Sequence, residues 1–280
     1  MALSLRLAMN EVPAPRVVFD HASVVFTTQS GETVQALTDF SLAIQPEEIV
    51  ALVGPSGCGK STALRLVAGL LKPTQGEVRV QADHAGRAWP AGRGFARVAI
   101  VFQRPTLLPW LSVLQNVLYP HKVLARRTDP ALRTRALELL DMVGIADMAA
   151  RMPEELSGGM QQRAAICRAL LLDPKVLLMD EPFGALDALT REDLQFDLLR
   201  IHGVTRKTIL LVTHSISEAV LLADRVAVMS PRPGRLQDLL DIDVPRPRDQ
   251  KSLAAPEFTA CSQRIRDGIF GHRAATERFS

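Results

Sequence analysis

The sequence predicts an α/β fold with a mainly parallel sheet, and two sets of segments carry this prediction. Short apolar runs with the composition of buried parallel strands occupy residues 49–53, 98–102, 176–179, 209–213 and 226–229. Segments with helix-like apolar spacing follow them at residues 61–71, 131–142, 160–172, 191–202 and 217–223. Strands that alternate with helices in this way are typical of domains with a largely parallel sheet.

Three segments fall outside this alternation. The first forty residues alternate, as around residues 24–28, and suggest an antiparallel sheet. Residues 104–173 are rich in helix-like sequence between two strands, which indicates an inserted helical subdomain. After Ser230 the chain holds several Pro and Arg residues, so we expect irregular structure before a final short helix. The expected organisation is a loose leader at 1–15, a main domain at 16–245 and a C-terminal extension at 246–280.

Composition excludes several classes of protein. The 280 residues hold 33 Lys and Arg against 30 Asp and Glu, a balance that argues against a nucleic-acid partner. Only 5% of the residues are aromatic, so stacking platforms for single strands are not expected. The 3 cysteines form no CxxC pair, which indicates a reducing cytosol. No apolar run approaches the roughly 20 residues needed to span a bilayer.

A glycine-rich phosphate loop is the strongest local signal. It follows the strand predicted at residues 49–53, opens a helix, and reads Gly54-Pro55-Ser56-Gly57-Cys58-Gly59-Lys60-Ser61-Thr62. Glycines let the backbone wrap around phosphates, and the N–H groups at a helix start favour an anion. Lys60 supplies a mobile charge for the phosphate oxygens, and Ser61 offers a hydroxyl to Mg²⁺. The motif predicts ATP or another nucleotide as ligand but does not choose among nucleotide-hydrolysing families.

Two acidic residues end the strand predicted at 176–179. Asp180, at the carboxyl end of the strand, is expected near the phosphate loop, where its carboxylate would hold Mg²⁺ directly or through water. Glu181 is then placed to orient and deprotonate the attacking water. Two solvated acids at a strand end are the alternative, which the presence of Lys60 makes unattractive.

A second glycine motif carries a family resemblance. Leu156-Ser157-Gly158-Gly159-Met160-Gln161 places a serine and two glycines at a helix start, which makes another anion cradle. Here the sequence resembles the ATPase subunits of ABC transporters, whose signature is LSGGQ-like, and the resemblance covers most of the chain. It implies a P-loop NTPase (RecA-like) core with an N-terminal antiparallel β subdomain and an inserted helical subdomain. It also implies that Ser157, Gly158 and Gly159 contact nucleotide bound to the other copy of a head-to-tail dimer.

The resemblance assigns further residues. Gln103 matches the glutamine that contacts Mg²⁺ or the water, Asp187 lies in the match to the D-loop, and His214 matches the switch histidine that contacts the γ-phosphate. Phe26 stands where the family has an aromatic that stacks on adenine. A lone aromatic is more often core or surface filler, which remains an alternative for Phe26.

Three positions merit separate interpretation. Glu47 stands where the family generally has glycine before the phosphate-loop strand, so we expect a different local turn there without loss of ATP binding. Met160, in place of the commoner glutamine, leaves the cradle glycines intact. Cys58 occupies a variable loop position, which gives only weak support for a reactive thiol, although a thiol at a helix start could be alkylated.

The resemblance implies transport rather than another nucleotide-driven process. A P-loop kinase or GTPase has no use for the motif at 156–161, and the chain has no N-K-x-D motif for guanine. Chromosome-type ABC ATPases carry long coiled-coil insertions, and translation-type ABC proteins carry two ATPase halves, so a soluble ABC ATPase is the weaker alternative. The expected partner is an integral membrane permease, with the chain peripheral at the cytoplasmic face of the inner or plasma membrane. Trp110 is a candidate permease contact; Leu107 and Leu108 fit subdomain packing nearly as well.

Cargo is indicated only by resemblance outside the catalytic motifs. Residues 104–110, 230–235 and 244–248 look like importer subunits for nitrate, sulfonate and taurine, which are served by a periplasmic or lipid-anchored solute-binding protein. Importers of pyrimidine-type vitamin precursors belong to the same branch and are the alternative. The arginines of these segments are interpreted as a solvated, proline-stiffened surface.

Overall fold

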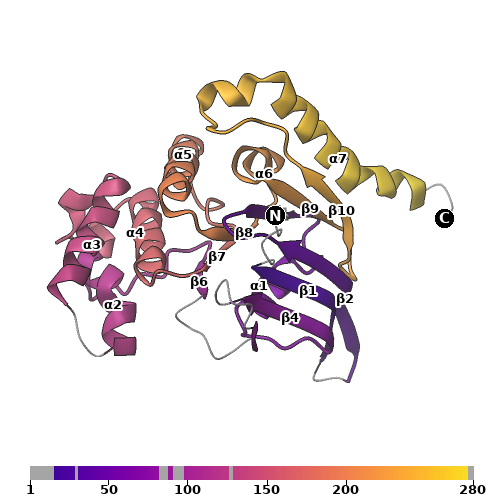
Figure 1. Ribbon diagram of the computed structural model, residues 1–280, viewed down its shortest axis with the longest axis horizontal. Coiled ribbons are helices and arrows are strands. Elements are labelled where there is room, and N and C mark those ends of the chain that lie inside the picture. The colour runs from indigo at the N-terminus through magenta and orange to yellow at the C-terminus, as the bar shows by residue number, and fades with distance from the viewer. Residues whose placement is uncertain (1–15, 29–30, 82–87, 91–97, 126–128, 277–280) are drawn as a thin grey trace, which may run out of the picture.

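A six-stranded sheet forms the centre of the protein (Figure 1). The computed structural model describes residues 16–28, 31–81, 88–90, 98–125 and 129–276, so the leader predicted at 1–15 lies outside the described residues. The strands run in the order β10-β9-β3-β8-β7-β6. All neighbours are parallel except β10 and β9, which are antiparallel. Their bounds are β3 Ile49–Val53, β6 Val98–Val101, β7 Val176–Asp180, β8 Thr208–Val212, β9 Arg225–Met229 and β10 Leu236–Asp241.

A separate antiparallel sheet has the strand order β2-β1-β4-β5. Its long strands β1 (Val17–Thr27) and β2 (Thr33–Ile44) come from the N-terminal region where alternation predicted such a sheet. The strands β4 (Gln75–Gln81) and β5 (Ala88–Pro90) come from beyond the phosphate loop. The mixed α/β fold with an N-terminal antiparallel part is therefore confirmed.

Helices cover the sheet and extend from one end of it (Figure 1). The segment between β6 and β7 supplies α2, α3 and α4. The helices are α1 Lys60–Val67, α2 Val113–Ala125, α3 Pro130–Met142, α4 Gly158–Leu171, α5 Ala188–Thr205, α6 Ile216–Leu222 and α7 Pro256–Thr276. Short 3-10 turns occupy Ala146–Met148, Pro153–Glu155 and Gln250–Ala254. Within the described residues, no helix is long and apolar enough to cross a membrane.

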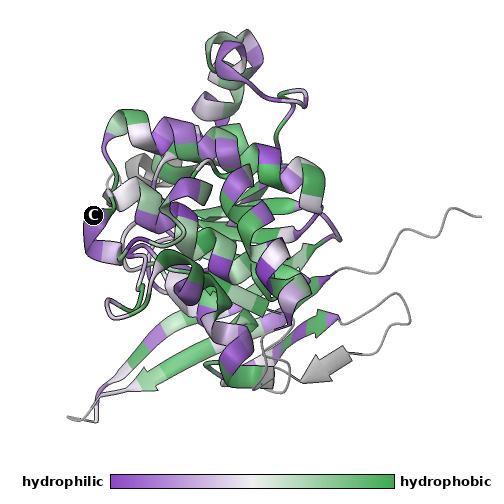
Figure 2. Ribbon diagram, turned by 90° about the vertical axis from the view of Figure 1, so that its left-hand side faces the viewer, coloured by the Kyte–Doolittle hydropathy of each residue, from purple (hydrophilic) through white to green (hydrophobic). Residues whose placement is uncertain are grey.

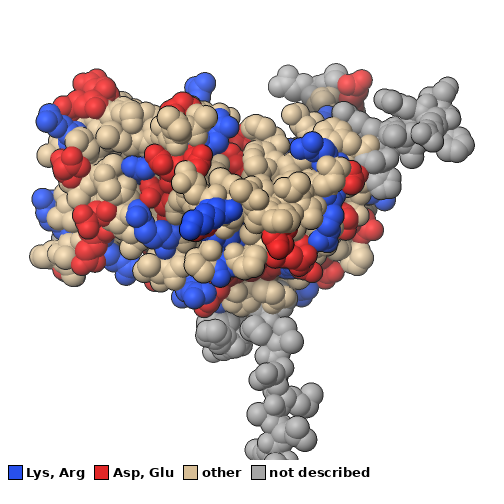
Figure 3. Space-filling view, turned by 90° about the horizontal axis from the view of Figure 1, so that it is seen from above, with Lys and Arg blue, Asp and Glu red and all other residues tan. Residues whose placement is uncertain are grey.

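The central strands are apolar on both faces, and each face belongs to a different core (Figure 2). Along β3, Ile49, Ala51 and Val53 face the core built with helices α2 to α7. Val50 and Leu52 face the core shared with α1 and the antiparallel sheet. Burial on both sides explains the continuous apolar runs of the sequence. The outer face seen in Figure 3 carries acidic beside basic side chains, so neither sign dominates it.

Helix ends differ from the sequence expectations for local reasons. The first helix ends at Val67, before Pro73, because Gly69 adopts a left-handed conformation with φ of 70° and closes the helix end. Helix α5 starts at Ala188 and continues to Thr205, three residues longer at each end than expected, because Asp187 accepts a capping bond from the Thr190 N–H.

The region after Ser230 is more regular than expected. It forms strand β10, which pairs with β9, and the 21-residue helix α7 in place of a short terminal helix. The sequence did not indicate this strand, because its apolar residues alternate only weakly and prolines lie on both sides of it. The expectation of irregular structure is therefore wrong for residues 236–241, and the expected final helix is present but longer than predicted.

The turn before β3 keeps a left-handed residue although glycine is absent. Glu47 has φ of 65°, so the expectation of a different local turn is wrong. Hydrogen bonds from distant residues hold the strained backbone: the Glu47 N–H donates to Thr208 Oγ1 at 2.9 Å, and its carbonyl contacts His202 Nε2 at 2.9 Å.

Two arginines of the proline-rich tail hold the carboxyl end of α6. Arg248 is buried and donates to the carbonyls of Val220, Leu221 and Ala223 at 2.6 to 3.1 Å. Arg246 bonds the Leu222 carbonyl at 2.7 Å and pairs with Asp224. Burial lowers the pKa of Arg248 to about 10, so its guanidinium stays charged at neutral pH. These arginines are thus a helix cap and not the solvated surface that the sequence suggested.

We expect Arg248→Met to lower the free energy of unfolding by about 3 kcal/mol, because several buried carbonyls lose their donor at once. Arg264→Met is the matched control, since Arg264 lies at the surface and, among the described residues, its ion pair is with the exposed Asp243; its cost should stay below about 0.5 kcal/mol. Urea unfolding followed by circular dichroism measures both. Equal losses in the two variants would contradict the capping role.

Candidate nucleotide-binding site

The phosphate loop joins β3 to α1 at the carboxyl edge of the parallel sheet. Gly59, the N-cap of α1, has φ of 107°. A Cβ at this position would lie 2.8 Å from the Ala36 carbonyl oxygen and 2.8 Å from Leu37 Cδ2. The loop therefore needs glycine both for its backbone conformation and for its close approach to β2.

Lys60 is the buried cation of this loop. Its Nζ donates to the carbonyl oxygens of Gly54 at 2.8 Å and Pro55 at 2.9 Å. Both acceptors are neutral, so the ammonium charge has no carboxylate bonded to it there. A phosphate entering the loop would find a positive charge and the first N–H groups of α1 directed to one place.

Asp180 lies beside the loop, as its position at a strand end predicts. Ser61 Oγ donates to Asp180 Oδ1 at 3.2 Å, which joins the first turn of α1 to the end of β7. Burial raises the pKa of Asp180, and the neighbouring Glu181 adds to this effect. A hydroxyl next to a carboxylate fits a hard cation such as Mg²⁺ that keeps phosphate and water ligands. In the described part of the chain, no cluster of three or more His, Cys, Asp or Glu side chains forms a complete protein metal site.

Glu181 and His214 form a pair over the same edge. His214 Nδ1 lies 3.2 Å from Glu181 Oε2, with 65% of the His214 side chain and 28% of the Glu181 side chain exposed. Glu181 adopts a left-handed backbone with φ of 47°, held by a bond from its N–H to the Val212 carbonyl at 2.9 Å. Strained backbone that neighbouring strands hold in place is common at functional sites.

Gln103 lies close to this pair. A Cβ built on Gly184 would be 3.0 Å from Gln103 Nε2 and 3.7 Å from Glu181 Oε2, so both side chains border the same glycine. The structure therefore brings Gln103, Glu181 and His214 to one region.

A cavity of about 280 Å³ joins the loop to the predicted adenine contact. Phe26, which is 39% exposed, lines it near the apolar residues Val34 and Ala36. The other lining residues are Ser56, Gly57, Gly59, Lys60, Ser61, Thr62, Glu181 and Arg232. The cavity thus has an aromatic part and a phosphate-binding part, as a nucleotide requires.

The second glycine motif starts α4. Ser157 is its N-cap and accepts a bond from the Met160 N–H at 3.3 Å. A Cβ on Gly158 would lie 3.7 Å from Leu186 Cδ2, so the motif packs against the segment that precedes Asp187. Helix α4 lies in the helical part of Figure 1, on the far side of β7 from α1. Of the described residues that line the nucleotide cavity, Lys60 is one, whereas Ser157, Gly158 and Gly159 are not among them.

Helix α4 also holds the segment that follows β6. Gln162 Nε2 donates to the Phe102 carbonyl at 3.0 Å. Arg168 donates to the carbonyls of Pro105 at 2.9 Å and Thr106 at 2.8 Å. The residues that flank Gln103 on both sides are thus bonded to the helix that begins at Ser157.

Comparison with known proteins decides the family. The model of the ABC transporter family matches residues 37–184, which hold the phosphate loop, Gln103, the motif at 156–161 and the acidic pair. The chain belongs to the ABC transporter family.

Similar proteins of this family include import ATP-binding proteins for taurine and for aliphatic sulfonates. The taurine import ATP-binding protein TauB of Rhizobium johnstonii is 46% identical over 255 residues, covering 88% of this chain and 94% of the relative. The aliphatic sulfonates import ATP-binding protein SsuB 2 of Burkholderia cenocepacia is 45% identical over 241 residues, covering 85% and 84%. Among solved structures, the ATP-binding cassette MJ0796, a dimer with bound ADP and Pi, is 32% identical with a TM-score of 0.67, covering 80% of this chain and 98% of that one.

Sequence reasoning missed two residues near the nucleotide site of this ABC protein. Glu218 on α6 is buried and accepts a bond from Thr213 Oγ1 at 2.5 Å, next to His214; burial raises its pKa. Arg232 lines the nucleotide cavity and was included in a surface-like segment. Glu218 lies in the helix predicted at 217–223, but no motif of the sequence marks it.

Cys58 of the phosphate loop is buried, and burial raises the pKa of its thiol. Lys60 Nζ lies 3.8 Å from its sulfur. These observations agree with the weak support in the sequence for a reactive thiol at this position, because a buried protonated thiol is a poor nucleophile.

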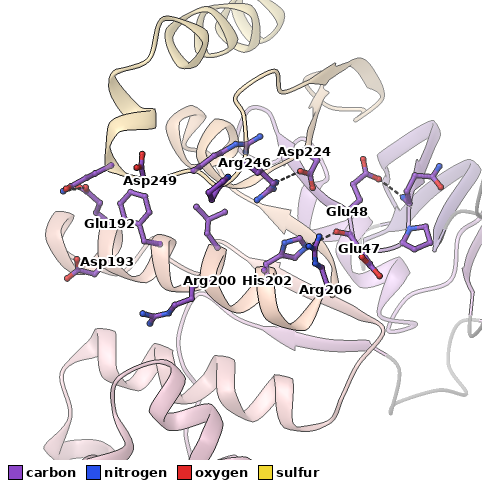
Figure 4. Close-up of a pocket in the computed structure, with 18 residues that line it drawn as sticks. Glu47, Glu48, Glu192, Asp193, Arg200, His202, Arg206, Asp224, Arg246 and Asp249 are labelled. Atoms are coloured by element: carbon purple, nitrogen blue, oxygen red, sulfur yellow. Dashed lines mark hydrogen bonds and ion pairs between the residues drawn. The ribbon is translucent and has the colours of Figure 1, made fainter.

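A larger cavity, of about 1140 Å³, lies between α5, the turn at Glu47 and residues 246–250 (Figure 4). Several of the side chains that line it are bonded to one another or to other residues of the chain. Arg246 pairs with Asp224, and Gln250 bonds Glu192. The cavity thus lies where residues 246–250 pass beside α5.

Proposed function

We propose that this chain is the ATP-hydrolysing subunit of an ABC importer for taurine or related aliphatic sulfonates. The observation that carries the ATPase assignment is the convergence of Lys60, Ser61, Asp180, Glu181 and His214 at one sheet edge. The relatives with identities of 45 and 46% support the cargo class. Nitrate and a pyrimidine precursor are the alternative cargoes, and the binding experiment below includes both.

Each residue of the site has a distinct task in this proposal. Lys60 and the loop N–H groups bind the phosphates, and Phe26 stacks on adenine. Ser61 and Asp180, with Gln103, hold Mg²⁺, which when bound neutralises charge on the phosphate oxygens. Glu181 accepts the proton of the attacking water at a carboxylate oxygen, and His214, 3.2 Å from it, fixes its orientation and contacts the γ-phosphate.

The complete site requires two copies. Ser157, Gly158 and Gly159 do not line the cavity that contains Lys60 of the same chain, which fits a contact with nucleotide held by a second, head-to-tail copy. The dimeric relative with bound ADP and Pi supports this arrangement. Nucleotide that touches both copies favours the closed pair over the open one.

An apolar groove is the proposed contact for the permease. It has a volume of about 490 Å³ and lies between β6, α2 and α4. Phe102, Tyr119, Val123 and Leu124 line it and are exposed, an unusual set for a free surface. Trp110 is exposed but outside this lining set, and Leu107 packs against the core, so the groove lies beside the segment predicted from sequence. A helix of the permease in this groove would keep the chain at the cytoplasmic face of the membrane.

We expect Val123→Glu to weaken permease binding at least about 10-fold, because a carboxylate would be desolvated in the apolar groove. ATP hydrolysis by the isolated subunit should stay within about 2-fold, since Val123 does not line the nucleotide cavity. Val204→Glu is the control: Val204 is 68% exposed against 57% for Val123, and lies on α5 outside the groove. Co-purification with the tagged permease measures binding. Equal retention of the permease by both variants would contradict the assignment.

Cargo is tested on the solute-binding protein that the proposal places upstream of the permease. Calorimetry with taurine, alkanesulfonates, nitrate and a pyrimidine precursor compares the candidate classes directly. Taurine or alkanesulfonate binding alone supports the proposal. Binding of the pyrimidine and of none of the anions would overturn the cargo assignment and leave the ATPase assignment standing, which a Mg-ATP hydrolysis assay checks separately.

A further inference from the structure

The loop after β9 is fixed against the phosphate loop. Gly234 donates its N–H to the Ala36 carbonyl and accepts from the Thr38 N–H, both at 3.0 Å. A Cβ on Gly234 would lie only 1.9 Å from the Cys58 carbonyl oxygen. Only glycine permits this approach, so backbone from the C-terminal part of the core is in direct contact with the nucleotide loop.

The same loop is braced internally. Ser230 Oγ bonds the Pro233 carbonyl at 3.1 Å and accepts from the Arg235 N–H at 3.0 Å, while the Ser230 N–H donates to the Arg235 carbonyl at 3.0 Å. A loop that is closed on itself and attached to β2 presents its side chains in fixed directions. Arg232, at its tip, therefore has a defined place.

Arg232 is directed to the phosphate loop. Its Nε donates to the Gly57 carbonyl at 3.3 Å, and one terminal nitrogen lies 3.7 Å from where a Gly57 Cβ would stand. The side chain lines the cavity that Phe26, Lys60 and Thr62 also line. Among the described residues, no carboxylate forms an ion pair with Arg232, so most of its guanidinium donors are available.

We propose that Arg232 is a second cation of the nucleotide site and binds the phosphate chain of ATP. The inference rests on the proposed ATPase function and adds a ligand-binding residue to it. A guanidinium is suited to phosphate oxygens, because its donors form two parallel, charge-assisted bonds. Lys60 serves the inner side of the loop, and Arg232 the side bordered by Gly57.

The test compares Arg232→Ala with Arg235→Ala, a matched control from the same loop. Arg235 is exposed and does not line the cavity, so its loss should leave affinity within about 2-fold. Arg232→Ala should raise the Kd for ATP about 10-fold, the usual size of a hydrogen-bonded charge contact. KM for ATP should rise by a similar factor while kcat changes less than about 2-fold, because the contact serves bound substrate and transition state alike.

Two further measurements identify the group that Arg232 contacts. Removing a cation–phosphate contact should make ATP affinity less dependent on NaCl concentration, and Arg232→Lys should restore part of both the affinity and the salt dependence. An affinity loss with unchanged salt dependence and no rescue by lysine would place the contact at the base or ribose and overturn the proposal. Equal effects in the Arg232→Ala and Arg235→Ala variants, or none in either, would also overturn it. Failure of the unmodified chain to bind ATP would instead refute the proposed function.

Discussion

Replacing Glu181 by Gln is expected to lower ATP hydrolysis by about 10²–10⁴-fold, the usual range for loss of a general base. The amide keeps the size of the side chain and can still bond His214, which lies 3.2 Å from Glu181 in the structure. It cannot accept the proton of the attacking water. Lys60 and the loop backbone are untouched, so ATP should bind normally and accumulate in a closed dimer. Single-turnover hydrolysis and nucleotide binding on the same preparation measure the two effects.

Glu257→Gln is the matched control for this experiment. Glu257 is exposed in the first turn of α7, so the substitution removes the same charge away from the site. Its hydrolysis rate should equal that of the unmodified chain. Near-normal turnover of the Glu181→Gln variant at saturating Mg-ATP would remove Glu181 from the role of base.

Replacing Ser157 by Asp is expected to reduce hydrolysis at least about 100-fold, because a carboxylate facing the phosphates of the other copy opposes closure by several kcal/mol. Aspartate caps helices as well as serine does, so α4 should keep its bond to the Met160 N–H and the fold its stability. ATP binding to one copy should persist. Sedimentation in the presence of ATP should show monomers where the unmodified chain forms dimers.

The control places the same change at another helix start. Ser112 Oγ accepts a bond from the Gln115 N–H, and Ser112→Asp keeps that cap. Ser112 is not part of the nucleotide site that the two copies are proposed to form together. Its activity should stay within about 2-fold of the unmodified chain. A chain that hydrolyses ATP at full rate while demonstrably monomeric would contradict the two-copy mechanism altogether.

The central strands could be predicted because burial on both faces leaves an unmistakable apolar run, as in β3 and β8. Elements with one exposed face were harder to predict from the sequence. Strand β10 carries Asp238 and Asp241 among half-buried residues, and it forms because β9 offers an open edge, which no local pattern reveals. The left-handed Glu47 is likewise stabilised by Thr208 and His202, more than 150 residues away in the chain.

The candidate site followed from motifs because its residues stand at strand ends and helix starts, whose positions the fold dictates. Lys60, Asp180 and His214 are of this kind. Arg232 is not, since its place depends on Gly234 touching Cys58 across a loop contact that only the folded chain contains. Arg248 was misread for a related reason: a basic, proline-rich segment has the composition of surface, and only the unpaired carbonyls of α6 draw it inside.

Helix α4 extends from the motif proposed to contact ATP to the groove proposed to bind the permease. Its first residue follows Ser157, and its later side chains Gln162 and Arg168 grip the backbone on either side of Gln103, beside the apolar groove. A permease that shifts the segment at residues 102–106 must therefore either break those bonds or carry the whole helix with it. In the proposed importer, α4 would therefore couple nucleotide contacted by Ser157 to a permease bound at the groove, so that ATP hydrolysis without movement of the permease would be disfavoured.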